Sequence, residues 1–468
     1  MCSAYTLPRW ADWNQNSRFD LTVAIVDHRT LAIDCCVENT GDYAFFDNHA
    51  YCDKAPGLSL LAVPAYLLWK AIAALPPVAR ALQRATASRA FAATLNPIGT
   101  GLLPEKIGFA AALSLATFLV VSVPAAALAA LLFFFLQTFS ASSWQRVAVA
   151  LSYALATPAF TYGGSFYAHQ LVAALLFAAF VLVFQCPRGG IGRPRQLAVG
   201  CLLGLAVAAE YPAVLIAGVL VSYGLWRHGG RWLAAGAVGA AGPLVIVAAY
   251  HWLIFATPVP VAYRYSALWQ QRHSIGFLSL TFPHWDALWG ITFSRYRGLF
   301  LLSPVLLLSF PGLYALWRRR THRAEVVVSV AAIVAFFAFN SSSAMWWGGF
   351  AIGPRYLVPV LPFLAWPLIG FVERPGQAWR RFVFAGLALI SWLSVWGMSW
   401  AGQHFPEDTR RFPLREYAWP HLAVGDLARN LGTLVGLSGW WSLLPLAFLT
   451  SAIGCGWWIA SRRWTETV

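Results

Sequence analysis

Charged residues are scarce in this sequence of 468 residues. They make up 11% of the chain, and only 18 are acidic against 33 Lys and Arg. A soluble domain carries about 25% charged residues, so the composition excludes an ordinary water-soluble globular protein. Hydrophobic residues reach 59% and recur in runs long enough to cross a bilayer core about 30 Å thick. The composition therefore predicts an all-α, polytopic transmembrane helical bundle.

Several enzyme signatures are also missing. The sequence has no G-x-x-x-x-G-K-[ST] phosphate-binding loop, no convincing nucleophile elbow and no Cys/His spacing typical of a metal site. The Gly-rich pieces that remain are more typical of turns. The seven cysteines are scattered, although Cys35, Cys36 and Cys52 share one loop and could form a disulfide in an oxidising compartment.

The apolar runs predict about 13 membrane-spanning segments. These are 58–75, 107–122, 124–139, 146–160, 170–186, 197–210, 212–226, 232–255, 299–317, 324–341, 355–372, 382–401 and 439–460. The run 107–139 is too long for one crossing, so Pro124 is interpreted as part of a tight helical hairpin. The run 197–226 is split at Tyr211-Pro212.

The distribution of Lys and Arg predicts the orientation of these segments. With the segments above, every basic cluster falls on one side, taken as the inner side. The clusters are Arg80, Arg84 and Arg89; Arg188, Arg193 and Arg195; Arg227 and Arg231; Arg318, Arg319, Arg320 and Arg323; Arg374, Arg380 and Arg381; and Arg462 and Arg463. The net charge of +15 is thus a topology signal, and no nucleic-acid partner is predicted.

The outer side then carries residues 1–57, 257–298, 342–354 and 402–438, and residues 58–468 form the multi-spanning domain. An odd number of crossings with an inner C-terminus places the N-terminus outside. The first 20 residues contain neither a signal region nor a spanning helix. A missing first helix would explain this, either lost from the given sequence or absent in this protein.

The first outer loop holds 8 of the 18 acidic residues. Residues 18–37 predict a helix lying along the membrane interface, with an apolar stripe at helical spacing. The stripe is Phe19, Val23, Val26 and Ile33, and it is flanked every seven residues by Asp20, Asp27 and Asp34. These three acids are either a solvated edge or part of a binding site.

The stretch 39–57 carries the strongest chemical signal. The residues Asn39-Thr40-Gly41-Asp42 are typical of a turn, which would present the Asp42 carboxylate. Asp53-Lys54-Ala55-Pro56-Gly57 follows and leads directly into the first apolar segment. A lysine above a helix entrance suits a lipid phosphate, and a nearby carboxylate can act as a base towards a hydroxyl. The alternative is that these acids are merely solvated.

Four further residues are candidates on the same outer face. His169 stands at the mouth of segment 170–186, and its alternative is an ordinary packed histidine. Glu210 precedes the Tyr211-Pro212 break, where an acid is functional or simply reaches the interface. Arg297 and Arg355 each open a helix and could neutralise a phosphate, or contact lipid headgroups instead.

Three patches of the sequence resemble a known family. They are Thr40-Gly41-Asp42 to Tyr51-Cys52-Asp53-Lys54-Ala55-Pro56-Gly57; Arg297-Gly298-Leu299-Phe300 with Ser303-Pro304; and Trp347-Gly348-Gly349-Phe350 through Gly353-Pro354-Arg355-Tyr356. In this order they resemble the GT-C superfamily of integral-membrane glycosyltransferases. The nearest sub-type looks like the glycosyltransferase 39-like proteins, which are related to protein mannosyltransferases and aminoarabinose transferases.

The resemblance implies transfer of a sugar from a polyprenyl-phosphate donor to a lipid, glycan or protein acceptor, with inversion, on the external face of the plasma (inner) membrane. Because the acidic pair that relatives often carry is absent at residues 14–18, the catalytic base is expected to be Asp42. The expected substrate-binding residues are Asp53, Lys54, His169, Glu210, Arg297, Arg355 and Tyr356. No cofactor is assigned, and a divalent metal ion is left open. Membrane lipids are expected partners.

Two departures from the family pattern are clear. No spanning helix precedes the first loop, and residues 14–18 read Asn-Gln-Asn-Ser-Arg where relatives often have an Asp-Glu pair. A flippase or transporter for a lipid-linked sugar, and a non-catalytic member of the same fold, remain alternatives. Transporters usually carry charge at the bilayer midplane, whereas here the membrane interior is poor in charge, and Glu210 is the acid assigned to it.

Overall fold

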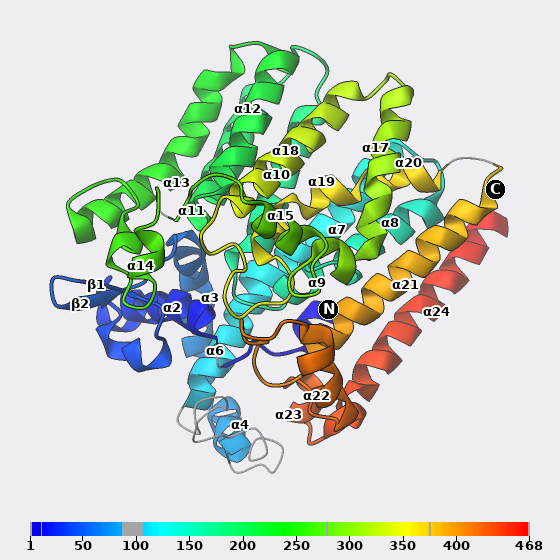
Figure 1. Cartoon of the computed structure of the whole chain (residues 1–468). Helices are drawn as coiled ribbons and strands as arrows, with labels where there is room; N and C mark the ends of the chain where they lie inside the picture. Colours follow the sequence, from blue (N-terminus) through cyan, green and yellow to red (C-terminus); the bar gives the residue numbers. More distant parts are fainter. Residues whose placement is uncertain (1, 11, 87–105, 278, 374–375, 467–468) are drawn as a thin grey trace.

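The computed structural model describes residues 2–10, 12–86, 106–277, 279–373 and 376–466. It is built almost entirely of helices (Figure 1). The longer ones are α2 (Trp13–Val23), α3 (Gly57–Ala73), α4 (Pro76–Thr86), α6 (Ile107–Thr117), α7 (Val123–Phe135), α8 (Ser143–Leu155), α10 (Ala168–Phe184), α11 (Arg193–Ala209), α12 (Ala213–His228), α13 (Trp232–Phe255), α17 (Ser309–Arg318), α18 (Arg323–Ser341), α21 (Ala378–Trp400) and α24 (Leu444–Glu466). The all-α prediction is confirmed.

Short elements join the longer helices. They are α1 (Cys2–Tyr5), α9 (Ala159–Tyr162), α14 (Gln270–His273), α15 (Trp285–Thr292), α16 (Leu299–Leu302), α19 (Leu361–Ala365), α20 (Leu368–Val372), α22 (Trp419–Ala423), α23 (Leu431–Leu434) and the antiparallel hairpin of β1 (Ala44–Phe46) and β2 (His49–Tyr51). The seven cysteines are all free thiols.

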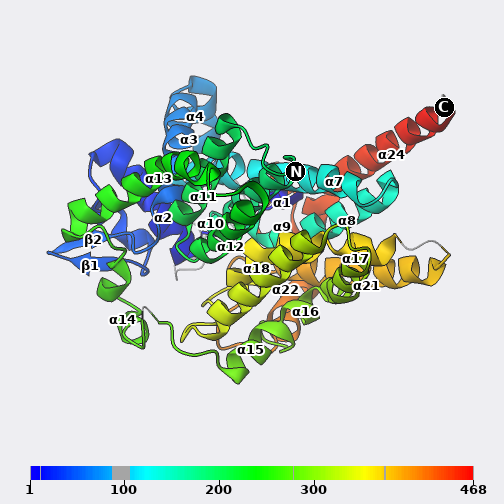
Figure 2. The same cartoon turned by 90° about the horizontal axis from the view of Figure 1, so that it is seen from above.

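Five helical stretches of the described chain are long and apolar enough to cross a membrane, or up to six if the bent pair α3 and α4 counts as one. They are Ile107–Thr138, Trp232–Phe255, Arg323–Ser341, Ala378–Trp400 and Gly439–Gly456. The protein is therefore a polytopic integral membrane protein, as its composition predicted. α24 extends away from the rest of the bundle (Figure 2).

The helical hairpin predicted over 107–139 is wrong. Ile107–Thr138 is a single helical stretch of 32 residues. A π-helical turn, Phe118–Ser122, precedes Pro124, which occupies the first turn of α7. Proline lacks an amide proton and clashes with the carbonyl four residues earlier, and a π turn absorbs that misfit without reversing the chain. The predicted split of 197–226, in contrast, is confirmed, because α11 ends at Ala209 and α12 begins at Ala213.

α11 and α13 pack unusually closely because glycines line their contact. A Cβ atom added to Gly200 would lie 1.9 Å from the carbonyl oxygen of Gly236, and one added to Gly204 would lie 2.8 Å from that of Ala240. Small residues let two helix backbones approach in this way, which is a common means of helix association in membranes. α11 ends at Ala209, directly before Glu210.

The basic turns of the chain gather at one end of the bundle. The amide of Gly189 donates to the Arg227 carbonyl oxygen at 3.2 Å, and the Arg227 guanidinium pairs with Glu325 at 3.5 Å. Arg319 forms an ion pair with Glu373. The turns after α10, α12, α17 and α20 therefore share one end, and for these turns the prediction of a common side agrees with the structure.

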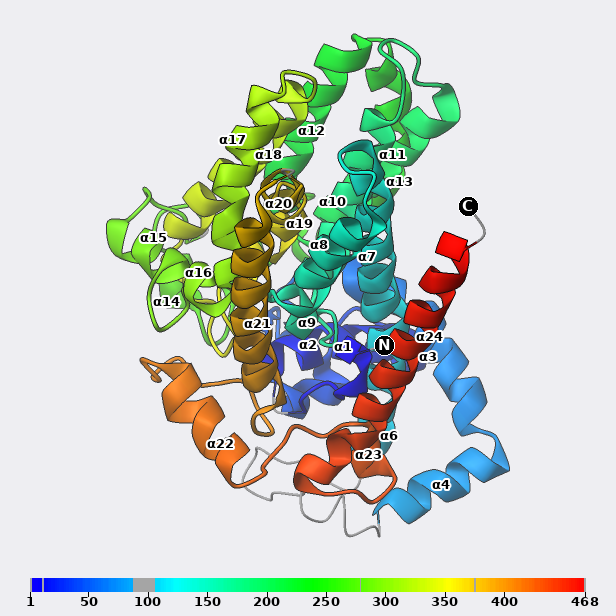
Figure 3. The same ribbon diagram turned by 90° about the vertical axis from the view of Figure 1, so that its right-hand side faces the viewer.

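The first basic cluster does not share that end. α4, which carries Arg80 and Arg84, packs against α3 and α6 and lies at the opposite end of the molecule (Figure 3). The reason is the continuous stretch Ile107–Thr138, which passes along the bundle once where the hairpin would have passed twice. Lys106 at its start pairs with Glu38 of the first loop at 2.7 Å. Arg89 lies outside the described residues.

The interfacial helix predicted for 18–37 is also wrong. α2 runs from Trp13 to Val23 and ends through a π turn, Ala24–His28. Almost all of α2 is buried, including its polar residues. Asp20 is fully buried and accepts a hydrogen bond from the Asn39 amide at 2.9 Å, so it is not part of a solvated edge. α2 thus forms the inner layer of the first loop rather than lying on the surface.

Candidate active site

A cavity of about 240 Å³ opens where the first loop meets loops from the second half of the chain. Its lining comes from the outer segments expected from the sequence, together with the start of α10. The polar residues on its wall are Asp12, Asn14, Asp42, Tyr167, Arg355, His404, Glu407 and Asp408, and the aromatic ones include Trp13 and Trp269. Sequence positions about 400 residues apart therefore meet at one place.

Asp42 reaches this wall from a tight turn. The Thr40 hydroxyl accepts a hydrogen bond from the Asp42 amide at 3.0 Å and donates one to the Trp13 carbonyl oxygen at 2.9 Å. Side-chain hydrogen bonds of this kind stabilise turns. Gly41 lies against the Trp13 ring, and a Cβ there would be 3.1 Å from it. The turn predicted at 39–42 is thus tied to the start of α2.

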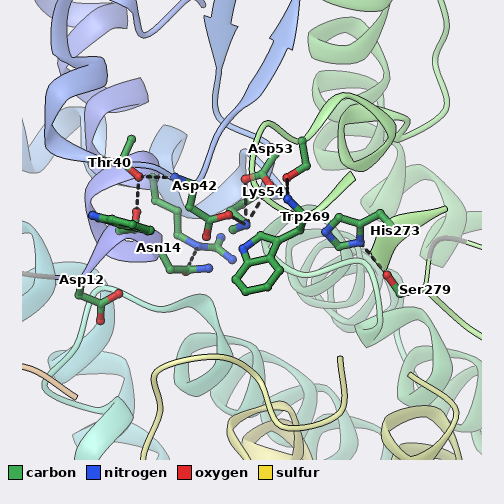
Figure 4. Close-up of polar contacts among 12 residues, drawn as sticks. Asp12, Asn14, Thr40, Asp42, Asp53, Lys54, Trp269, His273 and Ser279 are labelled. Atoms are coloured by element: carbon green, nitrogen blue, oxygen red, sulfur yellow. Dashed lines mark hydrogen bonds and ion pairs between the residues drawn. The ribbon is translucent and has the colours of Figure 1, made fainter. Parts of the chain in front are cut away.

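Lys54 lies between two carboxylates (Figure 4). Its Nζ is 2.9 Å from Asp42 and 2.8 Å from Asp53, and all three side chains are buried. Burial opposes ionisation of Asp42, but the Lys54 ammonium outweighs it and lowers the pKa of this carboxyl. Burial raises the pKa of Asp53 to about 6. Lys54 itself does not line the cavity, so Asp42 is the member of the trio that faces it.

Asp12 is a second carboxylate on the cavity wall, and sequence reasoning missed it. Tyr167 donates its hydroxyl hydrogen to the two Asp12 oxygens at 2.9 and 3.0 Å, and Gln15 donates to Asp12 at 2.8 Å. Burial raises the pKa of Asp12. The available signal was an acid directly before the polar helix α2. Its partner Tyr167 is 155 residues away in the sequence, and only folding connects the two.

Arg355 is the cation that lines the cavity. It begins η8 (Arg355–Val360), and its Nη1 donates to the Tyr167 hydroxyl at 3.1 Å. The guanidinium also lies over the rings of Tyr167 and Tyr356, 5.2 Å from each centroid. Tyr167 therefore connects Arg355 with Asp12. None of the described carboxylates forms an ion pair with Arg355, which leaves its charge available to an anion.

Glu210 and His169 belong to a second buried cluster beneath the cavity. Arg18 of α2 pairs with Glu210 at 2.6 Å, and the His169 Nδ1 lies 3.6 Å from the same oxygen. Arg18 also donates to the Asn14 side chain at 3.2 Å. The His169 ring stacks on Tyr167 with centroids 5.6 Å apart. The sequence suggested Glu210 and His169 but missed Arg18, which is the charge partner of Glu210.

Arg297 is placed differently from Arg355. Its guanidinium is buried and donates to the carbonyl oxygens of Gly349, at 2.7 Å, and of Ala351. It therefore holds the loop before Arg355 in place, and it does not line the cavity.

A metal site is not evident in the described part of the chain. No three His, Cys, Asp or Glu side chains there gather closely enough to hold an ion. Between Asp42 and Asp53 the cation is the Lys54 ammonium.

Comparisons with known proteins give one structural match. The sequence matches no protein-family model and no curated protein. Among solved structures, the chain is similar to the crystal structure of ArnT from Cupriavidus metallidurans in the apo state, with a TM-score of 0.49 and 16% identity. The match covers 82% of this chain and 59% of that one, so this chain spans less than two thirds of ArnT.

Proposed function

We propose that this protein is a membrane glycosyltransferase that moves a sugar from a polyprenyl-phosphate donor to an acceptor on the external face of the membrane. The observation that carries the proposal is the convergence of Asp42, Asp12 and Arg355 on one cavity. A carboxylate that can accept a proton and a cation with no carboxylate partner are the groups that such a transfer needs. The order of the three sequence patches, which resembles the GT-C pattern, selects this reaction among others.

In the proposed reaction, an acceptor hydroxyl oxygen attacks the anomeric carbon of the donor. As that bond forms, the bond from the anomeric carbon to the phosphate oxygen breaks, and the electron pair leaves with the lipid phosphate. Asp42 takes the hydroxyl proton, and a positioned base of this kind contributes about 10²–10⁴-fold. Arg355 stabilises the negative charge that develops on the departing phosphate, and its planar fork suits phosphate oxygens.

Lys54 has a positioning role in this proposal. The sequence suggested it as a phosphate ligand, yet its Nζ contacts two carboxylates and lies behind Asp42. The ammonium keeps Asp42 ionised, and a base must be ionised to accept a proton. Asp53, which does not line the cavity, is the second carboxylate that Lys54 contacts. Arg18, Glu210 and His169 fix the position of α2 beneath the cavity.

Transfer by purified protein in lipid nanodiscs tests the proposal. The donors are synthetic polyprenyl-phosphate sugars, the acceptor source is a membrane extract, and the readout is label transferred. Asp42→Asn should lower transfer at least about 10²-fold while donor binding persists. Asp12→Asn reports whether the second carboxylate is the base instead. Asp47→Asn is the matched control, because Asp47 lies exposed on the β1–β2 turn of the same loop.

The outcomes separate the alternatives. Near-normal transfer by Asp42→Asn would reject the assignment of the base. If wild-type protein moved labelled donor across a vesicle membrane without transferring the sugar, the flippase alternative would replace the enzyme. A protein that binds donor but neither transfers nor moves it would be a non-catalytic member of the fold.

A further inference from the structure

A second large concavity lies far from the candidate active site, at the basic end of the bundle. It is a groove of about 800 Å³ between α12 and α18. We propose that this groove binds an anionic glycerophospholipid, with the headgroup phosphate held by arginines at its rim and an acyl chain lying along its apolar wall. This proposal is independent of the proposed transfer reaction.

The rim carries an excess of positive charge. Four arginines line it, Arg188, Arg227, Arg320 and Arg323, together with one acid, Glu325. Glu325 is already satisfied, because it accepts from the Tyr223 hydroxyl at 2.5 Å and pairs with Arg227 at 3.5 Å. Across the described residues, no ion pair involves Arg188, Arg320 or Arg323. Arg323 donates its Nε hydrogen to the Trp317 carbonyl oxygen at 3.3 Å, but no described carboxylate pairs with any of the three, so all three can receive an anion.

Aromatic side chains place this rim at the level of a membrane interface. Arg188 lies over the Trp226 ring at 4.9 Å, and Arg323 lies over the Trp317 ring at the same distance. Both indoles line the groove, and they are 58% and 40% exposed. Tryptophan is enriched where a membrane meets water. Trp226 and Trp317 therefore hold Arg188 and Arg323 where lipid headgroups would lie.

Below the rim the wall becomes apolar. It is formed by Val219, Val327, Val328 and Ala331, and Gly218 opens it, since a Cβ added to Gly218 would meet nothing within 4 Å. A soluble phosphate would use the rim and leave this wall bare. A phospholipid uses both parts, because its acyl chain packs along the apolar wall while its phosphate meets the arginines at the rim. Basic pockets between membrane helices bind anionic headgroups in the same way.

The test measures lipid binding to the full-length protein in detergent by native mass spectrometry. Phosphatidylglycerol should bind, and phosphatidylcholine of the same chains should bind more weakly. Substituting Arg188, Arg320 and Arg323 by Gln should weaken phosphatidylglycerol binding about fivefold for each arginine removed. The matched control is Arg80→Gln with Arg84→Gln in α4, which lies at the other end (Figure 3) and should leave binding unchanged.

A second variant tests the wall. Gly218→Phe fills open space in the groove, so it should weaken phosphatidylglycerol binding while the folded protein keeps its melting temperature. Two results would overturn the proposal. One is phosphatidylglycerol binding that is unchanged by both the arginine substitutions and Gly218→Phe. The other is inorganic phosphate that competes at the same concentration as the lipid, which would make the groove a simple anion site.

Discussion

At the scale of single residues, the arrangement of Asp42, Lys54 and Asp53 sets the protonation of the candidate site. Lys54 reaches both carboxylates at hydrogen-bond distance, and one of them faces the cavity. The sequence indicated this trio through its turn residues and its position before α3. It did not indicate Asp12 or Arg18, because their partners Tyr167 and Glu210 come from the middle of the chain.

The pH dependence of transfer distinguishes the two carboxylates. A base acts when deprotonated, so the rate is constant above its pKa and falls below it. Lys54 outweighs burial and lowers the pKa of Asp42 from 3.8, so wild-type transfer should keep its rate down to mildly acidic pH. Lys54→Met removes the ammonium and should move the acid limb to higher pH.

A pH–rate profile of both proteins measures this effect. Burial raises the pKa of Asp12. If Asp12 were the base, the wild-type limb would therefore lie at higher pH than expected for Asp42. Lys54→Met would then leave it in place.

The Arg18–Glu210 pair gives a prediction about stability. Both side chains are largely buried and 2.6 Å apart. Glu210→Gln leaves the Arg18 charge without its carboxylate, which costs about 3–5 kcal/mol for a buried pair. We expect a clearly lower melting temperature in detergent for Glu210→Gln.

The double variant Arg18→Met with Glu210→Leu is the control, since it removes both charges together. It should recover most of the loss. A single Gln variant as stable as the wild type would show that the pair contributes little.

At the scale of elements, α11 and α13 bring their backbones into close contact, and α11 ends directly before Glu210. The sequence identified both helices and the break from their apolar runs and from Pro212. It did not identify the continuous passage of Ile107–Thr138, because hydropathy and proline position are the same for a hairpin and for a helix with a π turn. Backbone geometry makes that choice.

Gly200→Val tests the α11–α13 contact. Its Cβ would collide with the Gly236 carbonyl oxygen, and overpacking of this kind costs about 1–3 kcal/mol. The melting temperature should fall. Gly108→Ala is the matched control in α6, where a Cβ meets nothing within 4 Å, and it should be neutral or slightly stabilising. Equal melting temperatures for both variants would contradict the packing described.

At the scale of the whole molecule, most basic turns lie at one end, and the first loop with α4 lies at the other (Figure 3). Cysteine labelling in a cysteine-free background tests how these ends face the membrane. With a membrane-impermeant maleimide, His49→Cys in the first loop should react in intact spheroplasts. Arg231→Cys, in the turn between α12 and α13, should react only after permeabilisation.

Arg84→Cys adds a test of the correction made for α4. The pattern of basic residues alone predicted an inner position for Arg84, whereas the structure places α4 against α3 and α6, at the end opposite the other basic turns. Labelling of Arg84→Cys together with His49→Cys would support the structure. Labelling together with Arg231→Cys would restore the sequence-based topology.

The sequence by itself determined that this is a helical membrane protein, where most of its helices lie, and which loop carries Asp42, Asp53 and Lys54. Composition and apolar periodicity are local properties of the sequence. They are reliable here because a helix buried in a bilayer must be apolar along its length. Tertiary structure alone decided that Asp12 and Arg355 join Asp42 at one cavity, that Lys54 faces carboxylates, and that Arg297 holds a loop. These outcomes depend on contacts between residues hundreds of positions apart, which no local pattern encodes.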